Sequence, residues 1–436
     1  MKLYLPTLVA AVIATLYAGV DAVPKGVSGI NYDARNGSDW ETNNASCKSF
    51  TDVYHEMLTL QTFTEKVRTN SLIECDVANL VLQFASSIGV TVDLGIKTSK
   101  GRDYFLQEKV KLGEIIDKGR FDTVTSVHVG NGAISRDNVT VDTALEYMTE
   151  IRDFLRSRGK NASVTIADSI EVYNTNPKLL EAVDYVSVGY SPFWERVDVN
   201  EGVAVTLDRM KSLRIAAENK DKPVVIDTAW SSGGMNPIPD LATPKNQAKY
   251  FSDFIRMAHS HKDLDYYWSD AFDAKWLNDL DIEAHLGVYE KAGVMKEEIF
   301  NLQFENWRAP RLIRTEGSIM LSEADGKLYM SEKSNNWLTQ EQQTWFFDET
   351  TQQIRSKSSD RCLDAYQPWD GGAVHVYRCM DNERNQKWTY DNATRTLRHA
   401  THKGFCLDQD ASQNNKIQLY GCSPNNAHQQ WEVLDP

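Results

Sequence analysis

Six cysteines are the residues whose type and spacing permit the most definite chemistry in this chain. An even number of cysteines favours disulfides over metal ligation in an oxidising compartment. No Cys-x-x-Cys motif occurs in the sequence, which argues against zinc, and we expect no metal and no cofactor. Several pairings are possible, and the sequence gaps favour three local ones: Cys47–Cys75, Cys362–Cys379 and Cys406–Cys422.

The first 22 residues predict such a compartment. Lys2 precedes a mostly apolar stretch, 5–20, and small residues at Val20 and Ala22 form a cleavage motif. This pattern is typical of a secretory signal peptide cut after Ala22, so we expect a secreted protein, extracellular or in a cell wall. Asn-x-Ser/Thr motifs make glycosylation plausible after export. No later stretch reaches about 18 apolar residues, which predicts no membrane span.

A second group of regularly spaced residues lies in the C-terminal part. Gln343-Thr344-Trp345, Gln386-Lys387-Trp388 and Gln429-Gln430-Trp431 recur at a spacing of 43 residues. The second and third units also share Cys-Leu-Asp, at 362–364 and 406–408, and a later Tyr-x-Cys, at 377–379 and 420–422. Such a period indicates three copies of one supersecondary unit.

The N-terminal part alternates between short strand patterns and longer helical ones. The candidate strands are 27–31, 66–69, 91–96, 124–130, 163–168, 184–190, 223–229 and 265–271. Eight strands alternating with helices over about 275 residues match the size of a (β/α)8 TIM barrel. In such a barrel, functional side chains lie at the carboxyl ends of the strands.

The character of the sequence changes after about Trp307, where short strands replace the helical patterns. We therefore predict an α/β chain with a signal peptide over 1–22, a TIM barrel over 23–305 and an all-β domain of three repeats over 312–436. With 41% apolar and 25% charged residues the chain is globular. Its net charge of −14 repels phosphate backbones, which argues against nucleic-acid partners.

The Gln-x-Trp repeat resembles the ricin-type β-trefoil lectin module. In that family the repeat packs the core, while an Asp accepts hydroxyl hydrogen bonds and an aromatic ring stacks on the sugar. The first repeat lacks both cysteines and has Leu321 at the Asp position if no gap intervenes, so we expect no pocket there. The resemblance implies sugar-binding residues Asp364, His375, Tyr377 and Asn385 in the second repeat, and Asp408, Gln418 and Tyr420 in the third.

The barrel resembles family 17 glycoside hydrolases, especially cell-wall β-1,3-glucanases, over residues 24 to about 295. The motifs are Gly29-Ile30-Asn31-Tyr32, Val67-Arg68-Thr69-Asn70, Asp93-Leu94-Gly95-Ile96, Val129-Gly130-Asn131, Thr228-Ala229-Trp230-Ser231 and Ala271-Phe272-Asp273. The resemblance implies a retaining mechanism, with an acid/base and a nucleophile about 5–5.5 Å apart. It also implies that Tyr32, Arg68, Asn131, Tyr190 and Trp230 bind the glucan.

Both glutamates that the family uses are changed. Gly132 stands at the acid/base position, and Asp227 stands at the nucleophile position. Glycine cannot transfer a proton, and Asp is shorter than Glu by about 1.5 Å. Losing the acid and setting back the nucleophile would together raise the barrier by about 5–8 kcal/mol. His128, Asp168, Glu171, Asp270 and Asp273 are the side chains that can reach the cleft as substitutes.

Three functions remain open on the sequence. The favoured one is a secreted protein that binds β-1,3-glucan or another cell-wall polysaccharide on a disabled glucanase barrel, a pseudoenzyme with a lectin module. The second is an active retaining β-1,3-glucan hydrolase that the lectin module tethers to its substrate. The third is a pure lectin whose barrel is only a scaffold. The absence of a proton donor at residue 132 distinguishes the disabled barrel from an active hydrolase. Glucan binding by the barrel alone would exclude the pure lectin.

Overall fold

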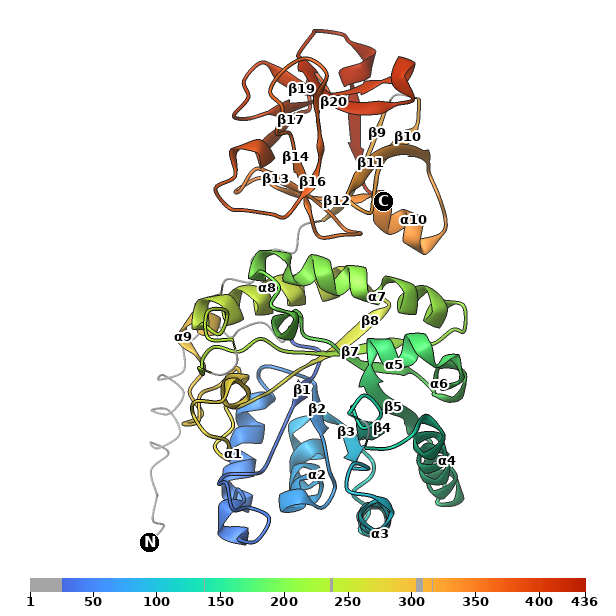
Figure 1. Ribbon diagram of the computed structural model, residues 1–436, viewed down its shortest axis with the longest axis vertical. Helices are drawn as coiled ribbons and strands as arrows, with labels where there is room; N and C mark the ends of the chain where they lie inside the picture. The colour runs from blue at the N-terminus through green and yellow to red at the C-terminus, as the bar shows by residue number, and fades with distance from the viewer. Residues whose placement is uncertain (1–25, 137, 236–237, 303–308, 316) are drawn as a thin grey trace, which may run out of the picture.

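The computed structural model describes residues 26–136, 138–235, 238–302, 309–315 and 317–436. The expected signal peptide and the expected linker around 305 lie outside these residues. Figure 1 shows two bodies, a larger one of alternating strands and helices and a smaller one of β-strands above it. Within the described part of the chain, no helix is long and apolar enough to cross a membrane.

The larger body is a closed barrel of parallel strands that pair in chain order, which confirms the predicted TIM barrel. Two strands have the predicted bounds, while the first is shorter because Val27 makes only an isolated bridge to Thr64. The strands are β1 Ile30–Asn31, β2 Lys66–Thr69, β3 Thr91–Ile96, β4 Val124–Asn131, β5 Ser163–Ser169, β6 Val186–Gly189, β7 Val224–Thr228 and β8 Leu264–Trp268.

The helices surround the barrel and follow the strands. Side chains of Ser49, Thr140 and Thr243 cap three of them by accepting a hydrogen bond from a backbone N–H of the first turn. The helices are α1 Phe50–Leu60, α2 Val77–Ile88, α3 Arg102–Asp117, α4 Val141–Ser157, α5 Ile170–Thr175, α6 Pro177–Ala182, α7 Gly202–Glu218, α8 Pro244–Ser260 and α9 Glu297–Phe300.

The smaller body consists of antiparallel strands and one short helix, α10 Trp337–Gln342. Its first strand begins at Pro310, two residues before the predicted domain start. The strands are β9 Pro310–Thr315, β10 Ile319–Ala324, β11 Lys327–Glu332, β12 Thr344–Asp348, β13 Gln353–Ser356, β14 Cys362–Asp364, β15 Gly372–Ala373, β16 His375–Tyr377, β17 Trp388–Asp391, β18 Thr396–His399, β19 Phe405–Asp410, β20 Lys416–Gly421 and β21 Trp431–Leu434.

The Gln-x-Trp tryptophans form the repeated core of this body. Trp345, Trp388 and Trp431 are buried, and each indole Nε1 donates a hydrogen bond of 2.9 Å to a leucine carbonyl. The accepting residues are Leu321, Leu363 and Leu407. This threefold equivalence is what a β-trefoil requires.

The same equivalence corrects the alignment of the first repeat. Because Leu321 matches Leu363, the residue that matches Asp364 is Ser322 and not Leu321, so a gap does intervene. Ser322 is buried and hydrogen-bonds Ser331, which occupies the place of the aromatic Tyr377. The first repeat therefore has neither the carboxylate nor the aromatic ring of a sugar pocket.

The three predicted disulfides are present. Cys47–Cys75 joins two loops at the carboxyl ends of β1 and β2, while Cys362–Cys379 and Cys406–Cys422 close the second and third trefoil repeats. Each closes a loop of fewer than 30 residues, which reduces the entropy of the unfolded chain.

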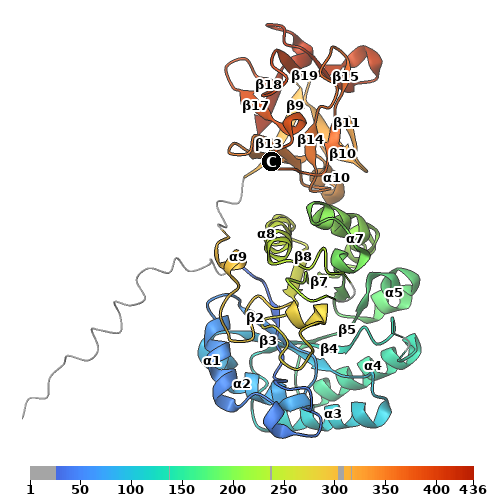
Figure 2. The same cartoon turned by 60° about the vertical axis from the view of Figure 1, so that its left-hand side comes forward.

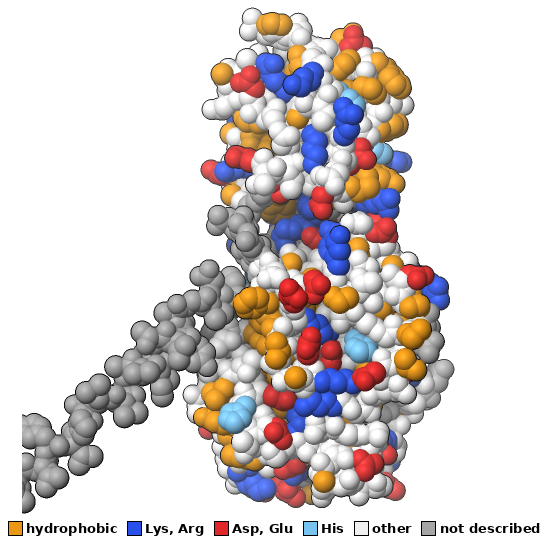
Figure 3. Space-filling model, turned by 90° about the vertical axis from the view of Figure 1, so that its left-hand side faces the viewer, with side chains coloured by type: hydrophobic (Ala, Val, Ile, Leu, Met, Phe, Trp, Pro, Cys, Tyr) orange, Lys and Arg blue, Asp and Glu red, His pale blue; other side chains and the backbone are white. Residues whose placement is uncertain are grey.

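The trefoil sits on α7 and α8 of the barrel, as the turned view in Figure 2 shows. Arg214 on α7 makes a paired hydrogen bond to Glu341 on α10, at 3.0 and 3.2 Å, and both residues are buried. Arg256 on α8 binds both carboxylate oxygens of Asp360, at 2.8 and 3.0 Å. Figure 3 shows blue and red side chains gathered where the bodies meet. Such two-point charged bonds fix orientation as well as distance.

Candidate active site and lectin pockets

Asp227 lies at the carboxyl end of β7, where the nucleophile position was expected. Asn31 Nδ2 donates to Asp227 Oδ2 at 2.8 Å, and Ser269 Oγ donates to Asp227 Oδ1 at 2.6 Å. Asn31 ends β1, and Ser269 directly follows β8. The sequence analysis assigned neither residue a role, although both stand at strand ends where barrel sites form. Both carboxylate oxygens of Asp227 are therefore held by the protein.

Arg68 lies beneath Asp227 and does not line an open cleft. Its side chain is 1% exposed, with Nε 3.1 Å from Asp93 and Nη1 3.5 Å from Asp227. Desolvation, and then the Arg68 charge, lower the pKa of the adjacent His128, which is 2.9 Å from Asp93. The guanidinium therefore pairs with the carboxylates of Asp93 and Asp227 inside the barrel, and the glucan contact of Arg68 stays a prediction.

Gly132 follows β4 at the expected acid/base position, and its backbone is left-handed, with φ of 63°. A Cβ built at this residue would lie 3.0 Å from Nη1 of Arg136. Arg136 is exposed and donates a hydrogen bond to the carbonyl of Asn131. The space that a residue 132 side chain would enter is therefore bordered by a cation.

The predicted glucan-binding aromatics divide by burial. Tyr32 is 2% exposed and donates to Glu56 at 2.6 Å, while Trp230 is fully buried and donates to the Leu241 carbonyl. Both rings are packed among other side chains of the barrel, and their contact with glucan stays a prediction. Asn131 is exposed and donates a hydrogen bond to Asn70. Tyr190 is half-buried, and its backbone N–H donates to the carbonyl of Asp227. Their contact with glucan also stays a prediction.

Most of the candidate substitutes for the missing proton donor are engaged elsewhere. Asp168 accepts from the backbone N–H groups of Ile134 and Ser135 at 2.8 and 3.1 Å. Asp273 is buried against Lys296 at 2.8 Å, and His128 lies in the barrel core. Glu171 is exposed in the first turn of α5.

Asp270 differs from the other substitutes. It follows Ser269, which hydrogen-bonds Asp227, at the carboxyl end of β8. Burial, followed by repulsion from Asp33 and Asp227, raises the pKa of Asp270 to about 8. A raised pKa close to the candidate nucleophile is the arrangement that a general acid needs.

The second trefoil repeat brings together Asp364, His375 and Tyr377, three of its four predicted residues. Asp364 is buried and lies 3.4 Å from His375 Nε2, and His375 stacks on Tyr377 with ring centroids 5.7 Å apart. Burial is the first cause that raises the pKa of Asp364. Asn385 instead accepts from His402 at 3.0 Å. Tyr366, which the sequence analysis missed, lies 4.8 Å from the His375 ring and is 47% exposed.

The third repeat forms a similar group. Asp408 is buried and accepts from Gln418 Nε2 at 3.0 Å, while Tyr420 is 42% exposed. A neighbouring loop adds Asp370, which accepts from the N–H of Gly421 at 2.7 Å. Two carboxylate–aromatic groups are therefore preserved, and both lie on strands next to a disulfide. No group of metal-ligating side chains occurs in the part of the chain that the structure describes.

Comparisons with known proteins agree with this architecture. Residues 29–287 match the BtgE/BtgC glycoside hydrolase domain, and residues 318–433 match the ricin-type β-trefoil lectin domain. The probable glucan endo-1,3-β-glucosidase btgC of Aspergillus terreus is 24% identical over 54% of this chain and 39% of that protein. The chain thus spans about two fifths of that relative's length.

Two further proteins match this chain over nearly all of their own lengths. The glucan 1,3-β-glucosidase of Saccharomyces cerevisiae is 22% identical over 66% of this chain and 96% of that protein. The crystal structure of a family 17 β-1,3-glucanosyltransferase from Rhizomucor miehei has a TM-score of 0.55 and 25% identity, covering 63% of this chain and 97% of that one. The chain belongs to the BtgE/BtgC glycoside hydrolase family, within family 17, and carries a ricin-type β-trefoil lectin domain.

Proposed function

We propose that this chain is a secreted protein that binds β-1,3-glucan in the barrel and glycans in the trefoil, and that it hydrolyses glucan negligibly. The observation that carries the proposal is Gly132, which offers no proton donor where the family places one. The left-handed backbone at Gly132 and the guanidinium of Arg136 beside it support the same reading. The relatives named as acting on β-1,3-glucan supply the expected ligand.

The surroundings of Asp227 also favour binding over attack. A retaining nucleophile must approach the anomeric carbon to about 3–3.5 Å. Asp227 is shorter than the family's glutamate, and both of its oxygens are engaged, by Asn31 and Ser269. The carboxylate of Asp227 therefore lies farther from the sugar than a glutamate would, and two hydrogen bonds hold it there. Asn131 and Tyr190 are at least partly exposed and can contact a sugar.

The wild-type protein is expected to bind laminarin oligomers without cleaving them. Calorimetric titration with laminaritriose and a reducing-end assay on laminarin, made on one sample, measure the two properties. An aryl β-glucoside with a good leaving group needs little acid assistance and should be the best surviving substrate. Cleavage of laminarin at an ordinary glycosidase rate, abolished by Asp227→Ala, would overturn the proposal. Absence of laminaritriose binding would favour a lectin with a scaffold barrel.

The second candidate function is slow β-1,3-glucan hydrolysis with Asp270 as proton donor, favoured by its raised pKa of about 8. A general acid works while protonated, so residual turnover is expected below pH 8 and should fall as pH rises through that value. Asp270→Asn should remove this residual activity at pH 6. A pH profile that stays flat between 6 and 9, or full activity in Asp270→Asn, excludes this candidate.

Both trefoil carboxylates are expected to matter for glycan binding. Asp364→Ala and Asp408→Ala each leave sugar hydroxyls unpaired, at a cost of about 1–3 kcal/mol of binding free energy per pocket. Glycan-array binding followed by titration with the best ligand measures both variants and the double variant. Since Ser322 replaces the carboxylate in the first repeat, the double variant should weaken trefoil binding more than either single variant does. Unchanged binding in the double variant would make the trefoil purely structural.

A further inference from the structure

We infer that the second-repeat pocket and the barrel cleft bind successive parts of one β-1,3-glucan chain, and that the segment between β6 and α7 bridges them. This rests on the proposed glucan binding by the barrel. The inference concerns only the second trefoil repeat. The pocket of this repeat is formed by Asp364, His375 and Tyr377, and Tyr366 lies beside the His375 ring.

The bridging segment begins beside Asp227. The backbone N–H of Tyr190 donates to the carbonyl of Asp227 at 2.9 Å, which places the start of the segment at the candidate nucleophile. Trp194 follows within the short helix Pro192–Glu195 and is 42% exposed, although the adjacent Phe193 is fully buried. An exposed indole is a stacking surface for a neutral sugar.

The same segment ends at the trefoil pocket. Asp198 lies 3.3 Å from the guanidinium of Arg378, and Arg378 directly follows Tyr377. The Arg378 guanidinium also lies 5.8 Å from the Tyr377 ring centroid. The exposed pocket ring is thus linked through one ion pair to the segment that carries Trp194.

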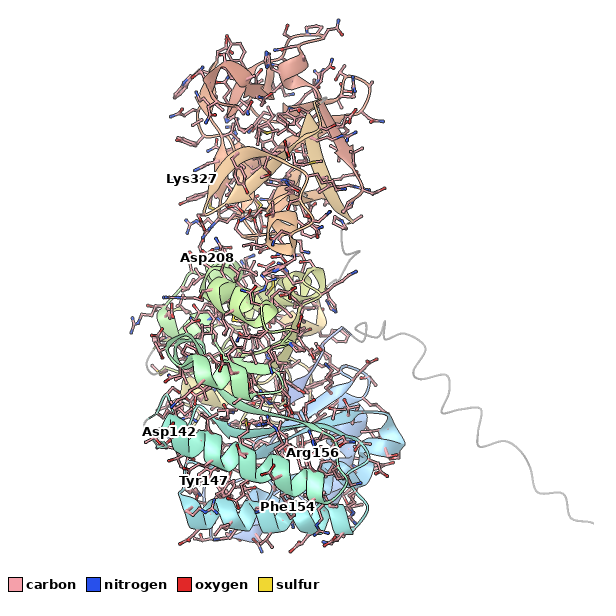
Figure 4. The ribbon with its side chains drawn as sticks, turned by 90° about the vertical axis from the view of Figure 1, so that its right-hand side faces the viewer. Asp142, Tyr147, Phe154, Arg156, Asp208 and Lys327 are labelled. Carbon is pink, nitrogen blue, oxygen red and sulfur yellow. A yellow bond between two sulfur atoms is a disulfide. The ribbon has the colours of Figure 1, made fainter. Side chains whose placement is uncertain are left out.

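Further ion pairs hold this arrangement in place. Arg361 directly precedes β14, the strand that ends at Asp364. It pairs with Asp208 at 3.1 Å and with Glu201 at 3.6 Å. Figure 4 labels Asp208 on α7 at the junction of the bodies. The buried pair of Arg214 and Glu341 fixes the other side of α7. These ion pairs fix the orientation of the second-repeat pocket relative to the barrel. A glucan bound to the barrel therefore loses less entropy when it also binds the pocket.

The third repeat lacks such a connection. Among the described residues, no ion pair joins 396–436 to the barrel, and Figure 1 shows β19 and β20 at the end of the trefoil away from the barrel. The two pockets thus share their chemistry but differ in position. Asp408 consequently serves as the internal comparison for Asp364.

The test is the dependence of affinity on chain length, measured with the full-length protein. Laminaritriose can occupy the cleft or the pocket only as separate molecules, while one long laminarin chain can reach both sites. For two sites joined in one ligand, a gain on the order of 10² in affinity per chain is expected. Asp364→Ala should remove most of this gain, at least about tenfold more than Asp408→Ala does. If Asp364→Ala has a lower melting temperature than wild type, Tyr377→Ala is measured in its place, because Tyr377 is exposed.

The bridge has its own matched pair of variants. Asp198→Asn breaks the ion pair beside the pocket, and Asp325→Asn breaks an exposed ion pair with Lys211 elsewhere on the same junction. The chain-length gain should fall severalfold in Asp198→Asn and stay in Asp325→Asn. Equal gains in wild type, Asp364→Ala and Tyr377→Ala, or equal losses in the Asp364 and Asp408 variants, overturn the inference. Failure of laminaritriose to bind wild type overturns the proposed function instead.

Discussion

Gly132→Glu combined with Asp227→Glu is expected to raise laminarin turnover by several decades over wild type, about 10²–10⁴-fold from the restored acid alone. The two glutamates would face each other across the bound bond, as the retaining mechanism requires. Each single change should give little activity, because Gly132→Glu leaves the nucleophile set back and Asp227→Glu leaves no acid. The double variant should exceed the product of the single effects, since the carboxylates act as a unit.

The backbone at residue 132 sets the conditions for this experiment. A glutamate in the left-handed region, at φ of 63°, costs about 1–2 kcal/mol, and its Cβ would meet Arg136. Arg136→Ala is therefore added as a third change, which frees the space and should increase turnover further. Initial rates of reducing-end release, with melting temperatures for each variant, separate catalysis from folding. If the folded triple variant stays inactive, residue 132 is not the missing acid position.

Arg68→Met is expected to destabilise the barrel by about 3–5 kcal/mol, the largest single-residue effect that we predict. Arg68 is 1% exposed and neutralises Asp93 and Asp227, so methionine would leave two carboxylates without their guanidinium. Its Nη2 also donates to Ser187 at 2.8 Å, a bond that methionine cannot replace. Urea unfolding followed by tryptophan fluorescence measures the change.

Arg158→Met is the matched control for that variant. Arg158 pairs with Asp117 at 2.7 Å on the barrel surface, with both side chains solvent-exposed. Because water already solvates both charges, its removal should shift the urea midpoint far less than Arg68→Met does. Similar midpoints for the two variants would mean that the buried network does not stabilise the barrel.

The trefoil illustrates how far periodicity in the sequence can reach. The spacing of the Gln-x-Trp units predicted three repeats, and the indole bonds to Leu321, Leu363 and Leu407 confirm them. The assumed period failed by one residue, because Ser322 and Asp408 each precede their tryptophan by 23 residues whereas Asp364 precedes Trp388 by 24. One additional residue in the second repeat is invisible to a fixed period and evident in the strand register.

The barrel illustrates the limit of motif reasoning. Tyr32, Arg68 and Trp230 stand at or next to strand ends, and that position predicted contact with glucan. The structure buries all three, because packing and local backbone direction decide whether such a side chain points into the cleft or beneath it. Asn31 and Ser269, which hold Asp227, come from the first and last strands and meet only when the barrel closes.

The sequence by itself determined the two domains, the eight strands, the disulfide pairs and the absence of a side chain at Gly132. These follow from local patterns, from short loop closures or from the covalent structure of glycine, and no folded arrangement can alter the last of them. Only the tertiary structure decided the raised pKa of Asp270 and the junction of Arg378 with Asp198. Burial and the approach of charges from distant segments depend on how the chain packs, which no local pattern specifies.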